Sequence, residues 1–504
     1  MTSTLSFDLT RGRLAKAALV LLALLLLTRL GHLTGPIDDP HSWRQADTAQ
    51  YADSFYRHGV DLLQPRVNWM GPSATLAFEF PLPEAVMAWA YHAFGHDLMY
   101  ARLVTLLCFA GAAWYLFLIV RRFSNDAFAL LSAAIYLFLP LSLYYSRAVH
   151  VDFAAVFFAH AMCYHMLRFA DAAGVGDALA AALAAVLAFL IKAPYVFYFA
   201  LPIALHTWHA GQVRRLLLLA LIGAPGVLGF LWWRQYSDAV NGAVPDWSFI
   251  PGYRKMVDMS AWYFGPASMR TDPAVWARLW SRLTHEVATK AGFWIGVFGA
   301  AAACLPRLNA HRPALRLLYA WLFGVAIYVL VFLNLNFIHD YYQMPLLAVC
   351  AVFIALGVAA PLWLFPASRM RQARASAAFL GVVVVFSCWL FANKYGYKAD
   401  LPREEAGRYA AAILPADTLV VAATNVDYTD CRDPRLLYRL GHEGWSLALA
   451  DVNPGLIARL HALGARYLVI LRTDDQPGPD SRLGTLMVSH ALTDGRHHVD
   501  VLGL

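Results

Sequence analysis

The sequence predicts an α-helical polytopic membrane protein with a small α/β domain at its C-terminal end. Apolar residues make up 60% of the 504 residues and charged residues only 14%, whereas a soluble domain carries about 45–50% apolar and about 25% charged residues. Long apolar runs recur through most of the chain, and the formal charge is +7. This composition excludes a soluble globular protein, a disordered chain and a nucleic-acid binder, so membrane lipids are the expected surroundings.

Eleven apolar segments are predicted to span the membrane. A spanning helix needs about 20 mostly apolar residues, because the hydrocarbon core is about 30 Å thick and a helix rises about 1.5 Å per residue. The first segment has no small-x-small cleavage site after it, so we interpret it as a retained anchor. The expected spans lie near residues 14–34, 98–120, 127–145, 151–169, 178–192, 193–210, 214–235, 288–305, 315–336, 343–365 and 375–393.

Basic residues in the short connections predict the orientation, because Lys and Arg are retained on the cytoplasmic side. Basic residues occur at every second connection between spans, as in Arg121-Arg122 and Arg214-Arg215. We therefore expect a multi-pass protein of the bacterial inner (plasma) membrane, with its N-terminus cytoplasmic and its C-terminal domain periplasmic.

Two domains are expected, a transmembrane domain over residues 1–393 and a periplasmic α/β domain over 394–504. The first domain carries outer loops at about 35–97 and 236–287. In the second domain, apolar runs at 417–422 and 467–471 predict strands, and 456–460 predicts a helix. Five of the six cysteines lie inside expected spans, so no disulfide framework or zinc-type cysteine spacing is available.

The first outer loop contains two candidate carboxylates. Asp47 follows Arg44 by three residues, and Glu79 stands between Phe78 and Phe80. A carboxylate beside a cation suits the binding and deprotonation of an acceptor hydroxyl, although Asp47 could equally cap a helix over 48–57. An acid between two aromatic rings at the membrane surface is expected to have a raised pKa or a charged partner.

More polar side chains stand at the predicted outer ends of other spans. Arg147 and Asp152 connect the third span to the fourth, and Lys192 ends the fifth. Cations beside carboxylates at the outer leaflet suit a lipid phosphate next to a reacting hydroxyl. Helix capping by Asp152 and snorkelling by Lys192 are the simpler structural readings. The candidate substrate-binding residues are Tyr51, His339, Asp340 and Tyr342.

The segments Trp43-Arg44-Gln45-Ala46-Asp47-Thr48, Ser146-Arg147 with Asp152, and Lys192-Ala193-Pro194 resemble membrane glycosyltransferases of the GT-C superfold. The resemblance is to the bacterial branch that groups protein O-mannosyltransferases with lipid A aminoarabinose transferases. It implies transfer, with inversion, of a hexosyl or pentosyl group from a polyprenyl-phosphate donor to an outer-leaflet or periplasmic glycolipid or polysaccharide, or less readily a protein. It also implies catalytic roles for Asp47, Asp152 and Glu79, and donor-phosphate binding by Arg44, Arg147 and Lys192.

Two motifs depart from the family pattern. The chain has Asp47-Thr48-Ala49-Gln50-Tyr51 where many relatives have Asp-Glu-x-Arg-Tyr, and Phe78-Glu79-Phe80-Pro81 where the aminoarabinose branch has Phe-Glu-Lys-Pro. These differences argue against assuming an aminoarabinose donor. No cofactor is required by the sequence, although the histidines near these acids are compatible with a divalent metal.

Two other functions remain open from the sequence. Arginines near the second outer loop, such as Arg254, Arg270 and Arg278, would suit an O-antigen ligase or polymerase. A polyprenyl-lipid or glycan transporter would need no covalent chemistry, but transporters place ionisable groups near the bilayer midplane, and the middles of these spans carry almost no charge. The arrangement around Asp47 favours the transferase, while the sugar and the acceptor are not specified.

Overall fold

The computed structural model describes residues 11–305, 312–364, 369–396 and 398–504, and these residues form two compact units. Unit 1 comprises the described residues of Met1–Leu33, Arg102–Trp233 and Asp258–Gly396, and unit 2 comprises those of Thr34–Ala101, Arg234–Val257 and Tyr397–Leu504. The first outer loop, expected within the membrane domain, therefore shares a compact unit with the C-terminal tail.

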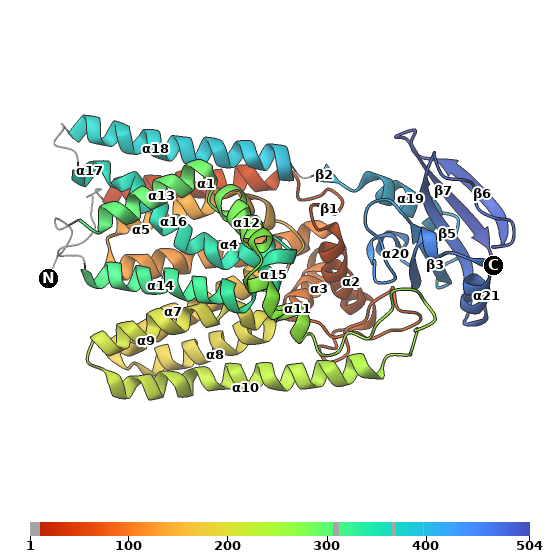
Figure 1. Cartoon of the computed structure of the whole chain (residues 1–504), viewed down its shortest axis with the longest axis horizontal. Coiled ribbons are helices and arrows are strands. Elements are labelled where there is room, and N and C mark those ends of the chain that lie inside the picture. Colours follow the sequence, from red (N-terminus) through yellow and green to blue (C-terminus); the bar gives the residue numbers. More distant parts are fainter. Residues whose placement is uncertain (1–10, 306–311, 365–368, 397) are drawn as a thin grey trace. The chain divides into compact units, whose positions relative to one another are not determined.

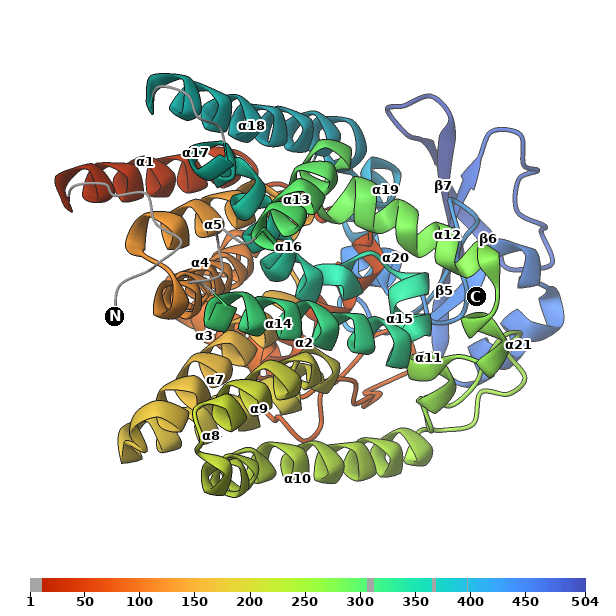
Figure 2. The same ribbon diagram turned by 60° about the vertical axis from the view of Figure 1, so that its left-hand side comes forward.

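Unit 1 is helical (Figures 1 and 2). Two of its helices, α4 and α10, extend into stretches of chain assigned to unit 2. The helices are α1 (Arg11–Leu30), α4 (Leu98–Phe123), α5 (Asp126–Phe138), α6 (Pro140–Tyr145), α7 (Asp152–Ala172), α8 (Val175–Lys192), α9 (Ala200–His209), α10 (Val213–Ala243), α11 (Ser260–Phe264), α12 (Pro273–Ser281), α13 (Lys290–Ala303), α14 (Arg312–Val331), α15 (Leu333–Ile338), α16 (Met344–Ala359), α17 (Pro361–Leu364) and α18 (Arg369–Leu390).

Among the described residues, seven helices are long and apolar enough to cross a membrane. In the part of the chain that the structure describes, each of the eleven predicted spans overlaps helical chain, but some are interrupted. The third is divided into α5 and α6, because Pro140 lacks a backbone N–H and pushes Leu139 into extended geometry, with ψ of 146°. The expected class, a polytopic helical membrane protein with a small α/β domain, is confirmed.

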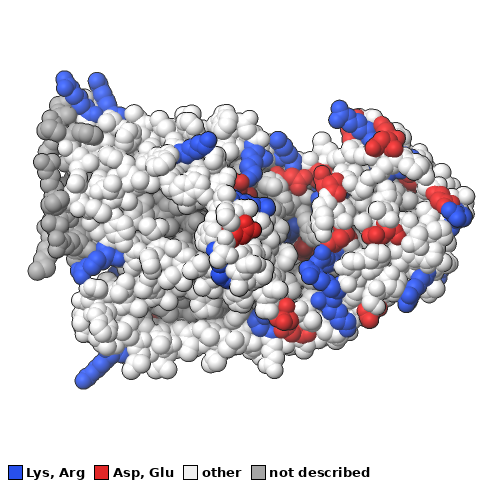
Figure 3. Space-filling model, in the orientation of Figure 1, with Lys and Arg blue, Asp and Glu red and all other residues white. Residues whose placement is uncertain are grey.

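The surface of unit 1 suits lipid. Figure 3 shows most of the visible surface over its helices without Lys, Arg, Asp or Glu. On α10, Leu217 and Leu228 are 73% and 64% exposed. Such exposure of large apolar side chains is costly in water and favourable in a bilayer.

Small residues bring membrane helices into close contact in unit 1. Helix α13 packs against α16, and a Cβ added at Gly357 would lie 1.9 Å from the carbonyl oxygen of Ile295. A Cβ at Gly299 would lie 2.3 Å from the backbone nitrogen of Gly357. The two helices therefore touch through their backbones, which is how helices associate where lipid removes the hydrophobic driving force.

Unit 2 contains a five-stranded mixed sheet in the order β4-β3-β5-β7-β6, where β3 is parallel to β4 and β5, and β7 is antiparallel to β5 and β6. The predicted tail strands and helix are confirmed as β3, β5 and α21. The elements are β1 (Asp38–Asp39), α2 (Ser42–His58), α3 (Leu82–Phe94), β2 (Lys398–Ala399), α19 (Leu401–Ala411), β3 (Leu419–Thr424), α20 (Arg435–Leu440), β4 (Gly444–Ala448), α21 (Pro454–Ala462), β5 (Ala465–Thr473), β6 (Thr485–Ala491) and β7 (His497–Gly503).

The first outer loop and the tail share one hydrophobic core in unit 2. The amide of Gly444 donates to the carbonyl of Asn68 at 2.8 Å, and the amide of Gly71 donates to the carbonyl of Gly444 at 2.7 Å. Gly444 has no room for a side chain, because a Cβ there would lie 1.8 Å from the carbonyl oxygen of Val420. This backbone contact joins the start of β4 to the loop that follows α2.

Candidate active site

Asp47 is a buried acid in the middle of α2. Asp47 is 6% exposed, and the indole N–H of Trp69 donates a hydrogen bond to its Oδ1 at 3.3 Å. Burial raises the pKa of Asp47 to about 7, although the positive charge of Arg44 and the hydrogen bond from Trp69 lower it. A carboxyl with a pKa near neutrality can exchange a proton at physiological pH.

Arg44 and Glu79 form an ion pair near Asp47. Arg44 Nη2 lies 2.6 Å from Glu79 Oε2, and the guanidinium carbon of Arg44 lies 5.8 Å from the centre of the Phe78 ring. The sequence predicts a raised pKa or a charged partner for Glu79, and Arg44 is that charged partner. Tyr51 is buried, and its hydroxyl donates to the carbonyl oxygen of Leu76.

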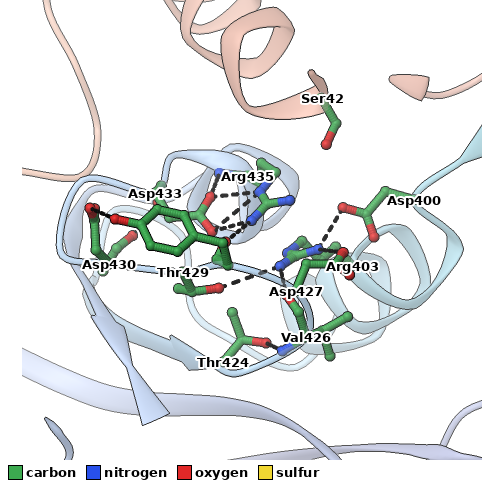
Figure 4. Close-up of polar contacts among 12 residues, drawn as sticks. Ser42, Asp400, Arg403, Thr424, Val426, Asp427, Thr429, Asp430, Asp433 and Arg435 are labelled. Atoms are coloured by element: carbon green, nitrogen blue, oxygen red, sulfur yellow. Dashed lines mark hydrogen bonds and ion pairs between the residues drawn. The ribbon is translucent and has the colours of Figure 1, made fainter. Parts of the chain in front are cut away.

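A small pocket opens beside the first turn of α2, with about 220 Å³ of empty space that includes its open mouth. Its guanidinium groups already have carboxylate partners: Arg403 Nη1 donates to Asp400 Oδ2 at 2.9 Å, and Arg435 pairs with Asp433 (Figure 4). The pocket is lined by Ile37, Ser42, Ala46, Asp400, Arg403, Arg435, Tyr438 and Arg439.

In unit 1, Asp152 is fully buried at the N-terminus of α7 and has three partners. Lys192 Nζ donates to both carboxylate oxygens at 2.9 Å, and His150 Nδ1 lies 2.6 Å from Oδ2. The Tyr195 hydroxyl also donates to the Asp152 carboxylate. Lys192 is therefore held by an acid forty residues earlier in the chain, and the two predicted site residues meet directly.

Aromatic rings surround the Lys192 ammonium group. Its nitrogen lies 4.5 Å from the ring centre of Tyr342, 5.1 Å from that of Tyr341 and 5.3 Å from that of Tyr195. The His339 ring stacks on Tyr341, with ring centres 4.9 Å apart and planes 13° from parallel. Cation–π contact stabilises an ammonium group in such a setting. The candidates Lys192, His339 and Tyr342, from two distant segments of the chain, therefore belong to one cluster.

Asp340 and Arg147 have separate partners. Asp340 accepts hydrogen bonds from the hydroxyls of Tyr145 at 2.6 Å and Tyr395 at 3.0 Å. Arg147 is buried, and its Nη1 donates to the carbonyl oxygen of His32 at 2.9 Å. Both side chains thus have structural partners in addition to any ligand they would contact.

Comparison with known proteins gives a partial family match and full-length structural matches. Residues 79–233 match the family described as dolichyl-phosphate-mannose-protein mannosyltransferase, a stretch that includes Glu79, Arg147, Asp152 and Lys192. No curated protein sequence matches the chain. The structure of ArnT from Cupriavidus metallidurans in the apo state aligns with a TM-score of 0.61 at 16% identity, covering 97% of this chain and 98% of that one. The chain has the GT-C glycosyltransferase fold.

Other solved proteins share the GT-C fold with this chain. The Archaeoglobus fulgidus oligosaccharyltransferase aligns with a TM-score of 0.57 at 12% identity, over 90% of this chain and 69% of that one. The mycobacterial arabinofuranosyltransferase AftD aligns with a TM-score of 0.54 at 16% identity, over 99% of this chain and 42% of that one. One ArnT structure contains undecaprenyl phosphate, and one structure of the archaeal enzyme AglB contains a dolichol-phosphate.

Some residues at these sites were not singled out from the sequence. Glu84 on α3 is 2% exposed, and burial raises its pKa to about 8; its position within an apolar run was the available signal. Trp69, Tyr195 and Asp433 carry no sequence signal, because the site acids that they act on lie far away along the chain.

The structure offers no ready metal centre within the residues it describes. No group of three or more His, Cys, Asp or Glu side chains in that part of the chain is placed to hold a metal ion. The candidate carboxylates instead have protein partners: Asp47 binds an indole, Glu79 and Asp152 bind cations, and Asp340 binds two tyrosine hydroxyls.

Proposed function

We propose that this chain transfers a sugar from a polyprenyl-phosphate donor to an acceptor on the outer side of the bacterial inner membrane. The GT-C fold and the undecaprenyl phosphate found in an ArnT structure support the donor class. The observation that carries the proposal is Asp47, a buried acid whose pKa of about 7 makes it an effective general base near neutral pH.

In the proposed reaction, the acceptor hydroxyl attacks the anomeric carbon of the donor sugar. The new carbon–oxygen bond forms as the bond from the anomeric carbon to the phosphate oxygen breaks. The hydroxyl proton passes to the Asp47 carboxylate, and the bonding electron pair leaves with the polyprenyl phosphate. Attack opposite the leaving group inverts the anomeric centre. No nucleotide is needed, because the lipid phosphate is itself the leaving group.

Cations would neutralise the charge that develops on the departing phosphate. Lys192, Arg44 and Arg147 are the proposed phosphate ligands. The pairs Lys192–Asp152 and Arg44–Glu79 hold two of these cations in fixed positions before the donor binds. Such preorganisation lowers the reorganisation needed in the transition state. In this proposal, Asp152 and Glu79 orient the cations that bind the phosphate.

Aromatic and polar side chains would complete the substrate site. Tyr342 and His339 belong to the aromatic cluster around Lys192, and their flat faces suit a sugar ring or a polyprenyl chain. Asp340 and Tyr51 are proposed to bind hydroxyl groups of the substrates. The proposed acceptor is an envelope glycolipid or polysaccharide, and a protein is the less favoured acceptor.

The proposal is tested by following radiolabelled monosaccharides linked to undecaprenyl phosphate, with total envelope lipid as acceptor and the full chain purified in detergent. Wild type is compared with Asp47→Asn and with Asp480→Asn, which changes an exposed acid of the tail. Transfer that falls at least a hundredfold only in Asp47→Asn, consistent with the usual contribution of about 10²–10⁴ from a general base, supports the proposal. Equal transfer in all three proteins would remove Asp47 from the chemistry.

A further inference from the structure

A buried ion pair of the tail lies against the start of α2. Arg435 binds Asp433 with two parallel hydrogen bonds, Nε to Oδ1 at 2.9 Å and Nη2 to Oδ2 at 2.8 Å, and their side chains are only 9% and 3% exposed. Arg435 Nη2 also donates to the carbonyl oxygen of Tyr428 at 2.7 Å. Figure 4 shows the pair and, beside it, Ser42 at the start of α2.

This pair holds α2 through Trp43. The guanidinium carbon of Arg435 lies 5.4 Å from the centre of a Trp43 ring, within the range of a cation–π contact. The ring of Tyr428 stacks on Trp43, with centres 5.9 Å apart and planes 21° from parallel. Trp43 and Asp47 are four residues apart on α2, so they share one face of the helix.

We infer that the Asp433–Arg435 pair is a positioning pair for Asp47. Its guanidinium fixes the first turn of α2 through Trp43, and its carboxylate supplies part of the negative field around Asp47. The inference extends the proposed function. Its activity measurement rests on that function, whereas its titration measurement does not. It gives the C-terminal domain a definite task in a reaction whose proposed base lies on the first outer loop.

The charges around Asp47 support this task. Within the described residues, the charged groups that act on Asp47 include Arg44 on α2, Glu79 in the segment before α3, and Asp433 in the loop before α20. The hydroxyl of Tyr51, also on α2, interacts with Asp47 as well. After burial, which has the largest effect, Arg44 lowers the pKa of Asp47, whereas Asp433 and Glu79 raise it. The negative charge of Asp433 therefore helps to hold the proton on Asp47 until the pH reaches neutrality.

Removal of each partner is expected to shift the titration of Asp47 in opposite directions. Asp433→Asn removes a nearby negative charge and leaves Arg435 unneutralised, so the pKa of Asp47 falls. Arg435→Gln leaves the Asp433 charge unneutralised, so that pKa rises. A shift of about 0.5–1 pH unit is expected each way, the size typical of a nearby charge that is not in direct contact. A purely structural role would not produce two opposite shifts.

The chain provides a matched control. Asp480 and Arg482 have the same two-residue spacing and the same forked geometry, with Arg482 Nε 3.1 Å from Asp480 Oδ1 and Nη2 2.6 Å from Oδ2. The Arg482 side chain is 76% exposed, and neither Asp480 nor Arg482 belongs to the charged groups that act on Asp47. Asp480→Asn and Arg482→Gln should leave the titration of Asp47 unchanged.

The experiment measures Asp47 directly and through activity. In purified full chain, the infrared carbonyl band of the protonated carboxyl is followed against pH, with Asp47→Asn subtracted to isolate Asp47. This titration needs no substrate, so it remains decisive if wild type transfers no sugar and the proposed function fails. Where transfer is observed, the pH at half-maximal kcat/KM should move with the infrared midpoint.

The expected result is a lower midpoint in Asp433→Asn, a higher one in Arg435→Gln, and a return toward the wild-type midpoint in Arg435→Lys, which restores the positive charge. If Arg435→Gln fails to fold, Asp433→Asn and Arg435→Lys still test the inference. Midpoints that stay within about 0.2 unit of wild type, well below the size of a nearby-charge effect, or that shift in the same direction in Asp433→Asn and Arg435→Gln, would overturn it.

Discussion

Substitution of Asp47 by Asn is expected to abolish most activity and, at alkaline pH, to stabilise the protein. Asn has nearly the shape of Asp, and its amide oxygen can still accept the Trp69 hydrogen bond. It has no proton to lose, however, so it removes the cost of ionising a carboxyl in a buried position. An acid held ready for catalysis would thus be a stability burden on the native fold.

The size and pH window of this effect follow from the pKa. In the native chain the pKa of Asp47 is raised from the ordinary value of 3.8 to about 7. Between these values the unfolded chain loses the proton while the native chain keeps it, so native stability falls as the pH rises. Below pH 3.8 no cost exists. Above pH 7 the cost is complete at about 4 kcal/mol, because each pKa unit corresponds to about 1.4 kcal/mol.

The prediction is tested by thermal unfolding of wild type and Asp47→Asn in the same detergent from pH 5 to pH 8.5. A chain of this length has an unfolding entropy near 1 kcal/mol per degree, so the melting temperature of the variant should exceed that of wild type by about 4 °C at pH 8.5 and by much less at pH 5. Asp480→Asn, the exposed control, should show no such pH-dependent difference. A difference in melting temperature between wild type and Asp47→Asn that stays the same at every pH in this range would refute the raised pKa.

Three further outcomes are expected. The kcat/KM of wild type should rise through pH 7 as Asp47 becomes ionised, which a pH–rate profile checks. Lys192→Gln leaves the buried Asp152 carboxylate without its cation and should destabilise the chain by about 3–5 kcal/mol; adding Asp152→Asn should restore part of the loss in a thermal double-mutant cycle. Gly357→Ala should lower the melting temperature, because its Cβ has no space, whereas Gly381→Ala, with open space around it, should leave it unchanged or raise it slightly.

Each of these outcomes has a result that would contradict it. A flat pH–rate profile between pH 6 and pH 8 would separate Asp47 from the rate-limiting proton transfer. Additive losses in the Lys192 and Asp152 cycle would mean that the ion pair contributes nothing of its own. Equal effects of the two glycine substitutions would contradict the backbone contact between α13 and α16.

The sequence by itself determined the class of the protein and many of its candidate residues. Membrane spans are local features, because the length of an apolar run is compared with a fixed bilayer thickness. Short apolar runs likewise located β3 and β5 in the tail. Asp152 and Lys192 stood out because charge at the end of an apolar helix is costly and therefore informative. Asp47 stood out because it follows Arg44 by three residues in the first outer loop. The interruption of the third expected span at Pro140 was not anticipated, although the proline itself was visible.

Only the tertiary structure decided which of these residues meet. Lys192 binds Asp152 across forty residues of chain, and Trp69 binds Asp47 across twenty-two. The Asp433–Arg435 pair reaches α2 from the far end of the sequence. Such contacts depend on how helices and strands pack against one another, and no local pattern of polarity or spacing encodes them. The pKa of Asp47 has the same origin, since burial and distant charges set it.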